Sequence, residues 1–201
     1  MRGRPLDDSG QAFPIYITVV GGLLFLAFAF LAVGQAATTR NEAQTAADAA
    51  ALAAAQDRRD LLAGQWVTDV LNPAKWRGIF EGNAPGLGDS CWRAQQLAAQ
   101  NNAHLIGEGC RDTGPLRFTV EVETDDTVGE TVVPGTEDKH AKASATAVIE
   151  SRCDFKPLDE DAEDDVLPSL TCKGGAIWDL DPENLLDLPE PKDLFDVHLA
   201  D

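Results

Sequence analysis

The sequence predicts an α+β protein, in which a long N-terminal transmembrane helix continues into an alanine-rich stalk and a small disulfide-stapled antiparallel sheet with helices follows. Three observations favour this class: an uncharged window of 31 residues from Ser9 to Thr39, an alanine-rich run directly after it, and alternating strands accompanied by four cysteines. The expected divisions are 1–11 (cytoplasmic N-terminus), 12–37 (transmembrane helix), 38–63 (stalk), 64–153 (extracytoplasmic domain) and 154–201 (acidic C-terminal region).

The transmembrane helix is predicted from length and apolarity. Phe13 to Val33 is almost wholly apolar, and as a helix it would span about 32 Å at a rise of ~1.5 Å per residue. A bilayer's hydrocarbon core is ~30 Å thick. In lipid the backbone must satisfy its own hydrogen bonds, which favours a helix. Pro14 lies near the start, where a missing N–H costs least.

Two other interpretations of this window remain open. A secretory signal could use Arg2 and Arg4 as its basic region, with a small-residue cleavage site near Gly34 and Gln35. Signal cores are ~7–15 residues long, whereas this apolar run is longer, so a retained anchor is favoured over an exported protein with a cleaved signal. A buried helix of a soluble protein is the third interpretation.

Basic residues set the expected orientation. Arg2 and Arg4 precede the span and only Arg40 follows it closely. The positive-inside rule therefore predicts a cytoplasmic N-terminus and an extracytoplasmic C-terminal domain in the cell membrane.

The alanine-rich run should extend the helix to about Leu62, because alanine is the best helix former and no glycine or proline intervenes before Gly64. Its small side chains share one helical face. This helix-packing face consists of Ala36, Ala43, Ala47, Ala50 and Ala54. It either packs on the chain's own domain or bundles with partner subunits, since small residues let helices approach closely.

Four cysteines follow the span, on the side expected to be oxidising: Cys91, Cys110, Cys153 and Cys172. Three pairings are open to four cysteines. Sequential pairing closes two loops of equal spacing and is the favoured one. Zinc sites need close cysteine pairs with nearby histidines, and this chain has neither, so no metal or other cofactor is expected.

The extracytoplasmic domain should contain a helix from Cys91 to about Asn101, capped by Ser90, and a small antiparallel sheet. Alternating apolar and polar residues indicate the strands. The expected strands are Leu116–Thr124, Thr131–Val133 and Ala143–Glu150.

Charge is concentrated at the C-terminal end. The chain carries a formal −18, and residues 154–201 hold 15 acidic and 3 basic residues, net −12. This balance excludes most nucleic-acid binders. The proline-containing end is expected to be loosely docked or disordered. An anchored acidic module that binds a cation or a cell-wall component is an alternative function, although Asp179, Asp181, Glu183 and Asp187 lack the spacing of a calcium loop.

No catalytic motif is present, and the histidines His104, His140 and His198 are scattered. We therefore expect no enzymatic activity.

The N-terminal region carries a family resemblance. Asp8-Ser9-Gly10-Gln11-Ala12, the apolar run after it, and the stretch from Asn41 to Ala53 together resemble TadE/TadG-like proteins of the tight-adherence (Flp) pilus system, of the actinobacterial type, over residues 7–60. The architecture is pseudopilin-like. The resemblance implies a non-enzymatic component of pilus assembly or surface attachment, whose partners are the membrane and other pilus-assembly or pseudopilin subunits contacted through the N-terminal helix.

The resemblance also implies a processing site between Gly10 and Gln11. Substrates of this type usually carry glutamate five residues after the cleavage glycine, and Ile15 occupies that position here. This departure favours TadG-like members that remain anchored, and it argues against a major repeating subunit.

Overall fold

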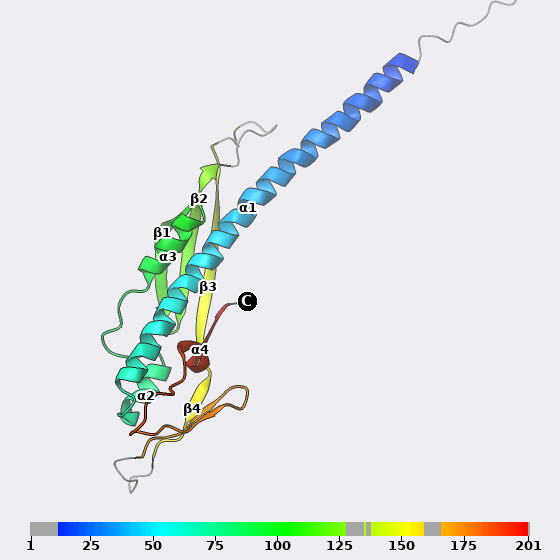
Figure 1. Cartoon of the computed structure of the whole chain (residues 1–201). Coiled ribbons are helices and arrows are strands. Elements are labelled where there is room, and N and C mark those ends of the chain that lie inside the picture. Colours follow the sequence, from blue (N-terminus) through cyan, green and yellow to red (C-terminus); the bar gives the residue numbers. More distant parts are fainter. Residues whose placement is uncertain (1–11, 128–134, 136–137, 159–165, 201) are drawn as a thin grey trace, which may run out of the picture.

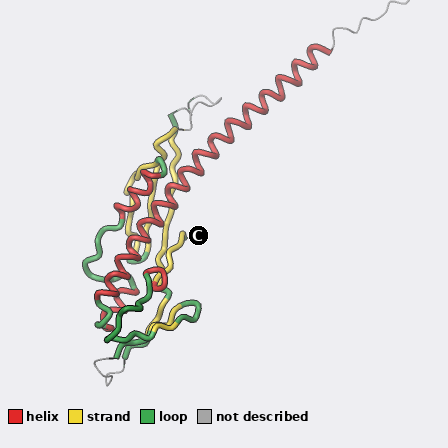
Figure 2. The backbone as a smooth tube through the Cα atoms, in the orientation of Figure 1, coloured by secondary structure: helices red, strands yellow, loops and turns green. Residues whose placement is uncertain are grey.

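Helix α1 (Ala12–Thr68) dominates the computed structural model, which describes residues 12–127, 135, 138–158 and 166–200. Its C-terminal half lies across a four-stranded antiparallel sheet, and its N-terminal half extends away from the folded part (Figures 1 and 2). Helix α3 (Cys91–Gln100) packs beside α1 and against the first strand. The fold is α+β, as the sequence predicts.

The sheet has the strand order β1-β2-β3-β7. Its strands are β1 (Ala103–Gly114), β2 (Arg117–Thr127), β3 (His140–Ser151) and β7 (Phe195–Leu199). A smaller sheet joins β4 (Cys153–Phe155), β5 (Leu170–Cys172) and β6 (Ile177–Trp178). The remaining helices are α2 (Pro73–Phe80), α3 (Cys91–Gln100) and α4 (Pro191–Leu194).

Helix α1 is continuous through the alanine-rich run, and it ends six residues beyond the expected Leu62. Strands β2 and β3 match the expected alternation. Phe118, Val120 and Val122 of β2 are fully buried, while their neighbours are partly or fully exposed. In β3 the buried residues are Ala145, Ala147 and Ile149. The expected strand at Thr131–Val133 lies outside the described residues.

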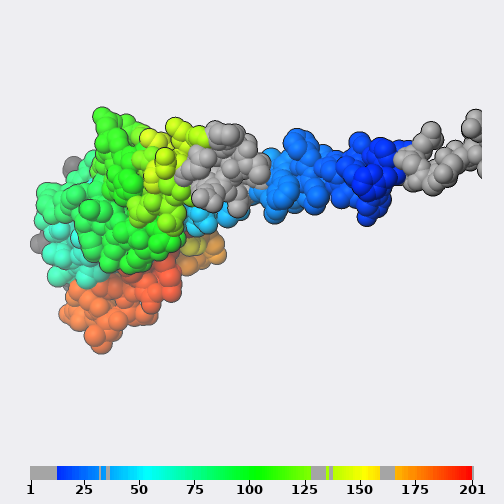
Figure 3. Space-filling model, turned by 90° about the horizontal axis from the view of Figure 1, so that it is seen from above, coloured from blue at the N-terminus to red at the C-terminus, as the bar shows by residue number. Residues whose placement is uncertain are grey.

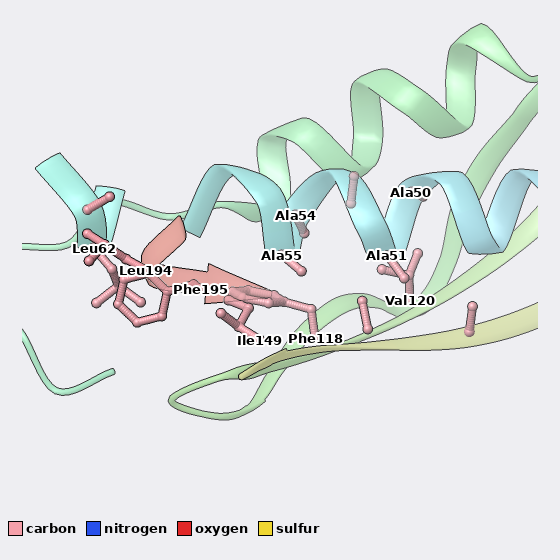
Figure 4. Close-up of a cluster of buried hydrophobic side chains, with 14 of the residues drawn as sticks. Ala50, Ala51, Ala54, Ala55, Leu62, Phe118, Val120, Ile149, Leu194 and Phe195 are labelled. Carbon is pink, nitrogen blue, oxygen red and sulfur yellow. The ribbon is translucent and has the colours of Figure 1, made fainter. Parts of the chain in front are cut away.

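The core lies between α1 and the sheet (Figure 4). Short alanine side chains on α1 let its backbone approach the strands closely, and larger side chains from the sheet and from the C-terminal segment fill the space between them. All ten labelled side chains are at most 1% exposed: Ala50, Ala51, Ala54, Ala55, Leu62, Phe118, Val120, Ile149, Leu194 and Phe195.

An aromatic cluster closes the end of the domain farthest from the projecting helix. The ring centroids of Trp66 and Trp76 lie 5.5 Å apart, those of Trp76 and Phe155 5.3 Å, and those of Phe80 and Phe195 5.5 Å. Such pairs add about 0.5–1.5 kcal/mol each beyond the area they bury. The cluster joins α1, α2, β4 and β7 into one core.

The expectation of a loosely docked C-terminal end is wrong for residues 191–199. Strand β7 pairs with β3, with Val197 opposite Ile149, and Leu194 and Phe195 are 0% and 1% exposed. Burial of these two apolar side chains and a strand ladder outweigh the acidic composition around them. The acidic segment 159–165 lies outside the described residues.

Both disulfides follow the sequential pairing. Cys91–Cys110 ties the start of α3 to β1, and Cys153–Cys172 joins directly opposed residues of β4 and β5. Each closes a loop with a sequence separation of 19, which the chain-entropy model rates at about 3 kcal/mol.

The expected cap of α3 is wrong in its detail. The Ser90 side chain makes no capping hydrogen bond, and Ser90 is 0% exposed. Instead, the Asp89 carboxylate accepts a hydrogen bond from the Cys91 N–H at 2.9 Å. The preceding residue thus supplies the acceptor that an unsatisfied helix N–H requires.

Candidate membrane anchor and contact surfaces

The N-terminal half of α1 is a candidate membrane span. Phe13–Leu31 has a mean hydropathy of 2.2 over 19 residues, and none of it is buried inside the folded protein. Bulky side chains such as Phe25 and Phe30 are 72% and 79% exposed. Figure 3 shows this half of the helix projecting from the folded part. An apolar helix exposed on all sides is typical of a segment surrounded by lipid.

Helix α1 passes from exposed to buried within a few turns. Thr39 is 7% exposed and Ala43 is 0% exposed, so burial begins there. Leu31 and Ala43 are separated by about 18 Å at ~1.5 Å per residue. The structure therefore holds the folded domain close to the end of the candidate span by an uninterrupted helix.

Most of the predicted helix-packing face is covered by the chain itself. Ala43, Ala47, Ala50 and Ala54 are all 0% exposed, and α1 packs there against α3, β2 and β3. The side chain of Ala36 lies outside the described set. That a partner helix also uses this face stays a prediction, and the burial means that such a partner would have to displace the chain's own elements.

The possible processing site, Gly10 and Gln11, lies outside the described residues. The four predicted disulfide cysteines are all paired, as described above, with no free cysteine among the described residues.

The three histidines lie in separate surface contacts. His104 Nδ1 is 2.7 Å from a carboxylate oxygen of Asp125, and His140 Nδ1 is 2.8 Å from the Thr124 carbonyl oxygen. His198 Nδ1 lies 3.1 Å from the carboxylate of Asp196. These contacts do not bring the histidines together into one site.

The acidic residues weighed for calcium do not converge. Asp181 instead accepts a hydrogen bond from the backbone N–H of Glu183 at 2.9 Å, which stabilises a local turn. Across residues 12–127, 135, 138–158 and 166–200, no group of three or more histidine, cysteine, aspartate or glutamate side chains could hold a metal ion.

Arg58 is a partly buried charge that the sequence analysis missed. Its side chain is 11% exposed, its guanidinium lies 3.2 Å from Asp112, and it stacks over Phe118 at 5.1 Å from the ring centroid. The contact ties α1 to β1 and β2. An available signal was the position of Arg58 four residues after Ala54, on the same helical face.

Asp69 fixes the turn between α1 and α2. Its carboxylate accepts hydrogen bonds from Lys75 Nζ at 2.6 Å and Gln65 Nε2 at 2.5 Å, and its carbonyl accepts one from the Trp76 indole N–H at 3.2 Å. The Lys75 hydrogen bond, with that of Gln65, holds the pKa of Asp69 below its usual value.

Two polar grooves flank the half of the domain nearest the projecting helix. One, of about 430 Å³, lies between α1, the end of α3 and the end of β2, beside Asn41 and Asn102. The other, of about 370 Å³, lies between α1 and β3 where β7 ends, beside Asp48 and Ser144.

Helix α1 combines an exposed apolar half with an alanine-rich half that enters the core, the combination on which the TadE/TadG-like resemblance rests. Residues 10–57 match the Tad family. The description of this family model is "Putative Flp pilus-assembly TadE/G-like", and the match confirms the resemblance predicted from the sequence. This Tad segment, residues 10–57, includes the candidate span and most of the buried part of α1.

A comparison with curated proteins and one with solved structures gave no match. The Tad segment supports a role in Flp pilus assembly.

Proposed function

We propose that this chain is a non-enzymatic, single-pass membrane protein that acts in Flp pilus assembly or surface attachment, with its N-terminus in the cytoplasm and its folded domain outside. The observation that carries the proposal is the Tad segment, where one helix joins an exposed apolar span to the core of the folded domain.

The continuity of α1 would couple the folded domain mechanically to the membrane span. A helix without a proline between the span and the domain transmits rotation and tilt, because its backbone hydrogen bonds run without interruption. The orientation of the domain relative to the membrane is then set by the span. Such a protein presents its outer surfaces to neighbours in a fixed direction, which suits an assembly component.

The disulfides support the orientation. Both connect residues of the domain, and disulfides persist in oxidising compartments outside the cytoplasm. Arg2 and Arg4 on the short side of the span favour the same orientation.

The anchor is tested by placing a charge within the span. Leu24→Arg puts a cation near the middle of Phe13–Leu31, at a cost of about 2.5–3.5 kcal/mol for insertion. Thr38→Arg is the matched control, because Thr38 is exposed and lies beyond the span. We expect carbonate-washed membranes to retain the wild type and Thr38→Arg, and to lose a large share of Leu24→Arg.

The orientation of the domain and its role in pilus assembly are measured in the same cells. Protease added to intact spheroplasts should digest the domain, and N-terminal sequencing should recover a chain that still contains Phe13–Leu31. Deletion of the chain should reduce the number of Flp pili, with wild type and Thr38→Arg restoring them. A mature chain starting near Gln35, or normal piliation after deletion, would contradict the proposal.

A further inference from the structure

Strand β3 extends well beyond its partner β7. Strand β3 covers His140–Ser151, while β7 pairs with it only from Ala147 to Ser151, after which the Ala200 N–H donates to the Thr146 carbonyl at 2.8 Å. On this side, no described strand pairs with β3 between residues 140 and 145. Figure 1 shows β7 stopping part-way along β3. The open edge is about 20 Å long at ~3.4 Å per residue.

The direction of the backbone groups follows from two hydrogen bonds. The Ile149 N–H donates to the Leu116 carbonyl at 2.8 Å, so odd-numbered residues of β3 direct their backbone groups toward β2. The Thr146 carbonyl faces β7. Because these directions alternate along an antiparallel strand, the N–H and C=O groups of Lys142 and Ser144 point to the open edge.

A groove of about 370 Å³ lies along this edge, in line with β7. Gln44 and Asp48 of α1 form one wall, Ser144 and Thr146 of β3 form another together with Arg117 of β2, and Leu199 and Ala200 close one end. The Asp48 carboxylate accepts a hydrogen bond from Gln44 at 2.7 Å. Within the described part of the chain it has no ion-pair partner.

We propose that this β3 edge groove binds an extended segment of a second polypeptide, which pairs antiparallel to β3 in continuation of β7 and places a basic side chain beside Asp48. Backbone hydrogen bonds to Lys142 and Ser144 supply affinity in this mode of strand addition, and side-chain contacts supply specificity. The continuity with β7 determines an extended conformation for the added segment.

Charge argues for a different protein as the partner. The chain carries a formal −18, so two copies repel each other over long range, whereas a basic segment is attracted to the chain as a whole. Within the groove, Asp48 is the acidic group that such a segment would meet, although Arg117 also lines the groove. The inference rests on the proposed function in one respect: the partner must be reachable on the side of the membrane where the domain lies. Gln44 is about 20 Å along the helix from Leu31, within reach of a neighbouring membrane-anchored subunit.

The test uses the full chain in its native cells. A photo-crosslinking amino acid replaces Lys142 at the open edge, and the same group at Lys173 is the matched control. Both lysines are exposed, at 64% and 61%, and each is ion-paired with a glutamate. Mass spectrometry of the crosslinked peptide identifies the partner segment.

Two variants at Ser144 separate strand pairing from general proximity. Ser144→Pro removes the N–H that faces the open edge without removing a bond to β2, as an edge strand tolerates, and Ser144→Ala keeps that N–H. We expect the Lys142-position adduct with a second protein to persist in Ser144→Ala and to fall about tenfold in Ser144→Pro. The Lys173-position signal should not change.

Asp48→Lys supplies an independent arm, since it reverses the charge of the groove wall on a partly exposed helix position. Asp48→Lys should also reduce the amount of adduct at the Lys142 position. If Ser144→Pro lowers the thermal midpoint of the protein, Asp48→Lys is the variant that tests the proposal. An adduct insensitive to both variants, an adduct formed only with another copy of this chain, or no adduct overturns the proposal. Carbonate fractionation of the same cells reports separately whether the proposed membrane anchor has failed.

Discussion

Substituting Ala50 by leucine tests whether the chain itself fills the alanine face of α1. Ala50 is 0% exposed in the layer between α1 and the sheet (Figure 4). Leucine adds three carbon atoms where no space faces solvent, and neighbouring side chains must leave their preferred rotamers. Inserting extra methylenes into a packed core typically costs about 1–3 kcal/mol.

The thermal consequence follows from the size of the protein. For a domain of this size, 1 kcal/mol shifts the midpoint by about 3 °C, so Ala50→Leu should lower Tm by about 3–9 °C. Ala37→Leu is the matched control, because Ala37 is exposed on the same helix before the core begins. Exposed substitutions usually stay within about 0.5 kcal/mol, so the control should melt like the wild type.

Circular dichroism of the purified full chain in detergent, under non-reducing conditions and at two protein concentrations, measures this difference. A decrease in Tm caused by strain within one chain does not depend on protein concentration, whereas a decrease caused by a weakened interface between subunits does. If Ala50→Leu melts like Ala37→Leu while pilus assembly fails in Ala50→Leu alone, a partner fills this face and the reasoning is refuted.

Five further variants probe helix α1, the core and the segments that follow α1. Gly64→Ala should raise the unfolding free energy by about 0.5–1 kcal/mol, because a Cβ at this helical position meets nothing within 4 Å. Gly82→Ala should lower the unfolding free energy, because the backbone φ there is +78° and the Cβ would lie 2.7 Å from a carbonyl oxygen. Urea unfolding measures both changes. Phe118→Ala should cost about 3–5 kcal/mol in the same assay, and a smaller loss would mean that the site collapses around the cavity. The lowered pKa of Asp69 gives stability that is present above its unfolded pKa and is lost as pH falls through its folded pKa. Asp69→Asn and Lys75→Met should each remove that part of the acid dependence of the unfolding free energy. An unchanged dependence of the unfolding free energy on pH in both variants would contradict this role of Asp69.

The sequence was sufficient where structure is determined locally. Helix α1 and the interior of β2 and β3 follow from alanine content and from strict alternation, which Phe118, Val120 and Val122 display. Strand β1 was missed because its alternation is broken between Leu105 and Cys110, where the pairing register shifts and Gly107 and Gly109 have φ of +61° and +66°. Such a bulge removes the period-2 pattern on which strand prediction depends.

Strand β7 was missed for a different reason, since its signal was present. Phe195, Val197 and Leu199 alternate with Asp196 and His198, which is a period-2 pattern over five residues. The acidic, proline-containing surroundings favoured a disordered end. Pairing with β3, far away in the sequence, decides the outcome, and composition over a window does not report such long-range contacts.

The local sequence also did not predict which part of the protein packs on the alanine face of α1. Small side chains predict that a neighbouring backbone comes close, but they do not identify which one. In the structure that neighbour is the chain's own α3 and sheet.

The two possible cleavage points in the sequence both precede the first buried residue that the structure describes in α1. Processing after Gly10, or signal removal near Gly34, would leave Thr39 and every buried alanine in place. Burial within the core supplies the stability of the folded domain, so an anchored chain and a released one should unfold with nearly the same free energy. Unfolding measurements therefore report on the core alone, while the fate of the exposed apolar half of α1 decides whether the domain stays at the membrane. Localisation and N-terminal sequencing are the measurements that separate an anchored assembly component from an exported domain.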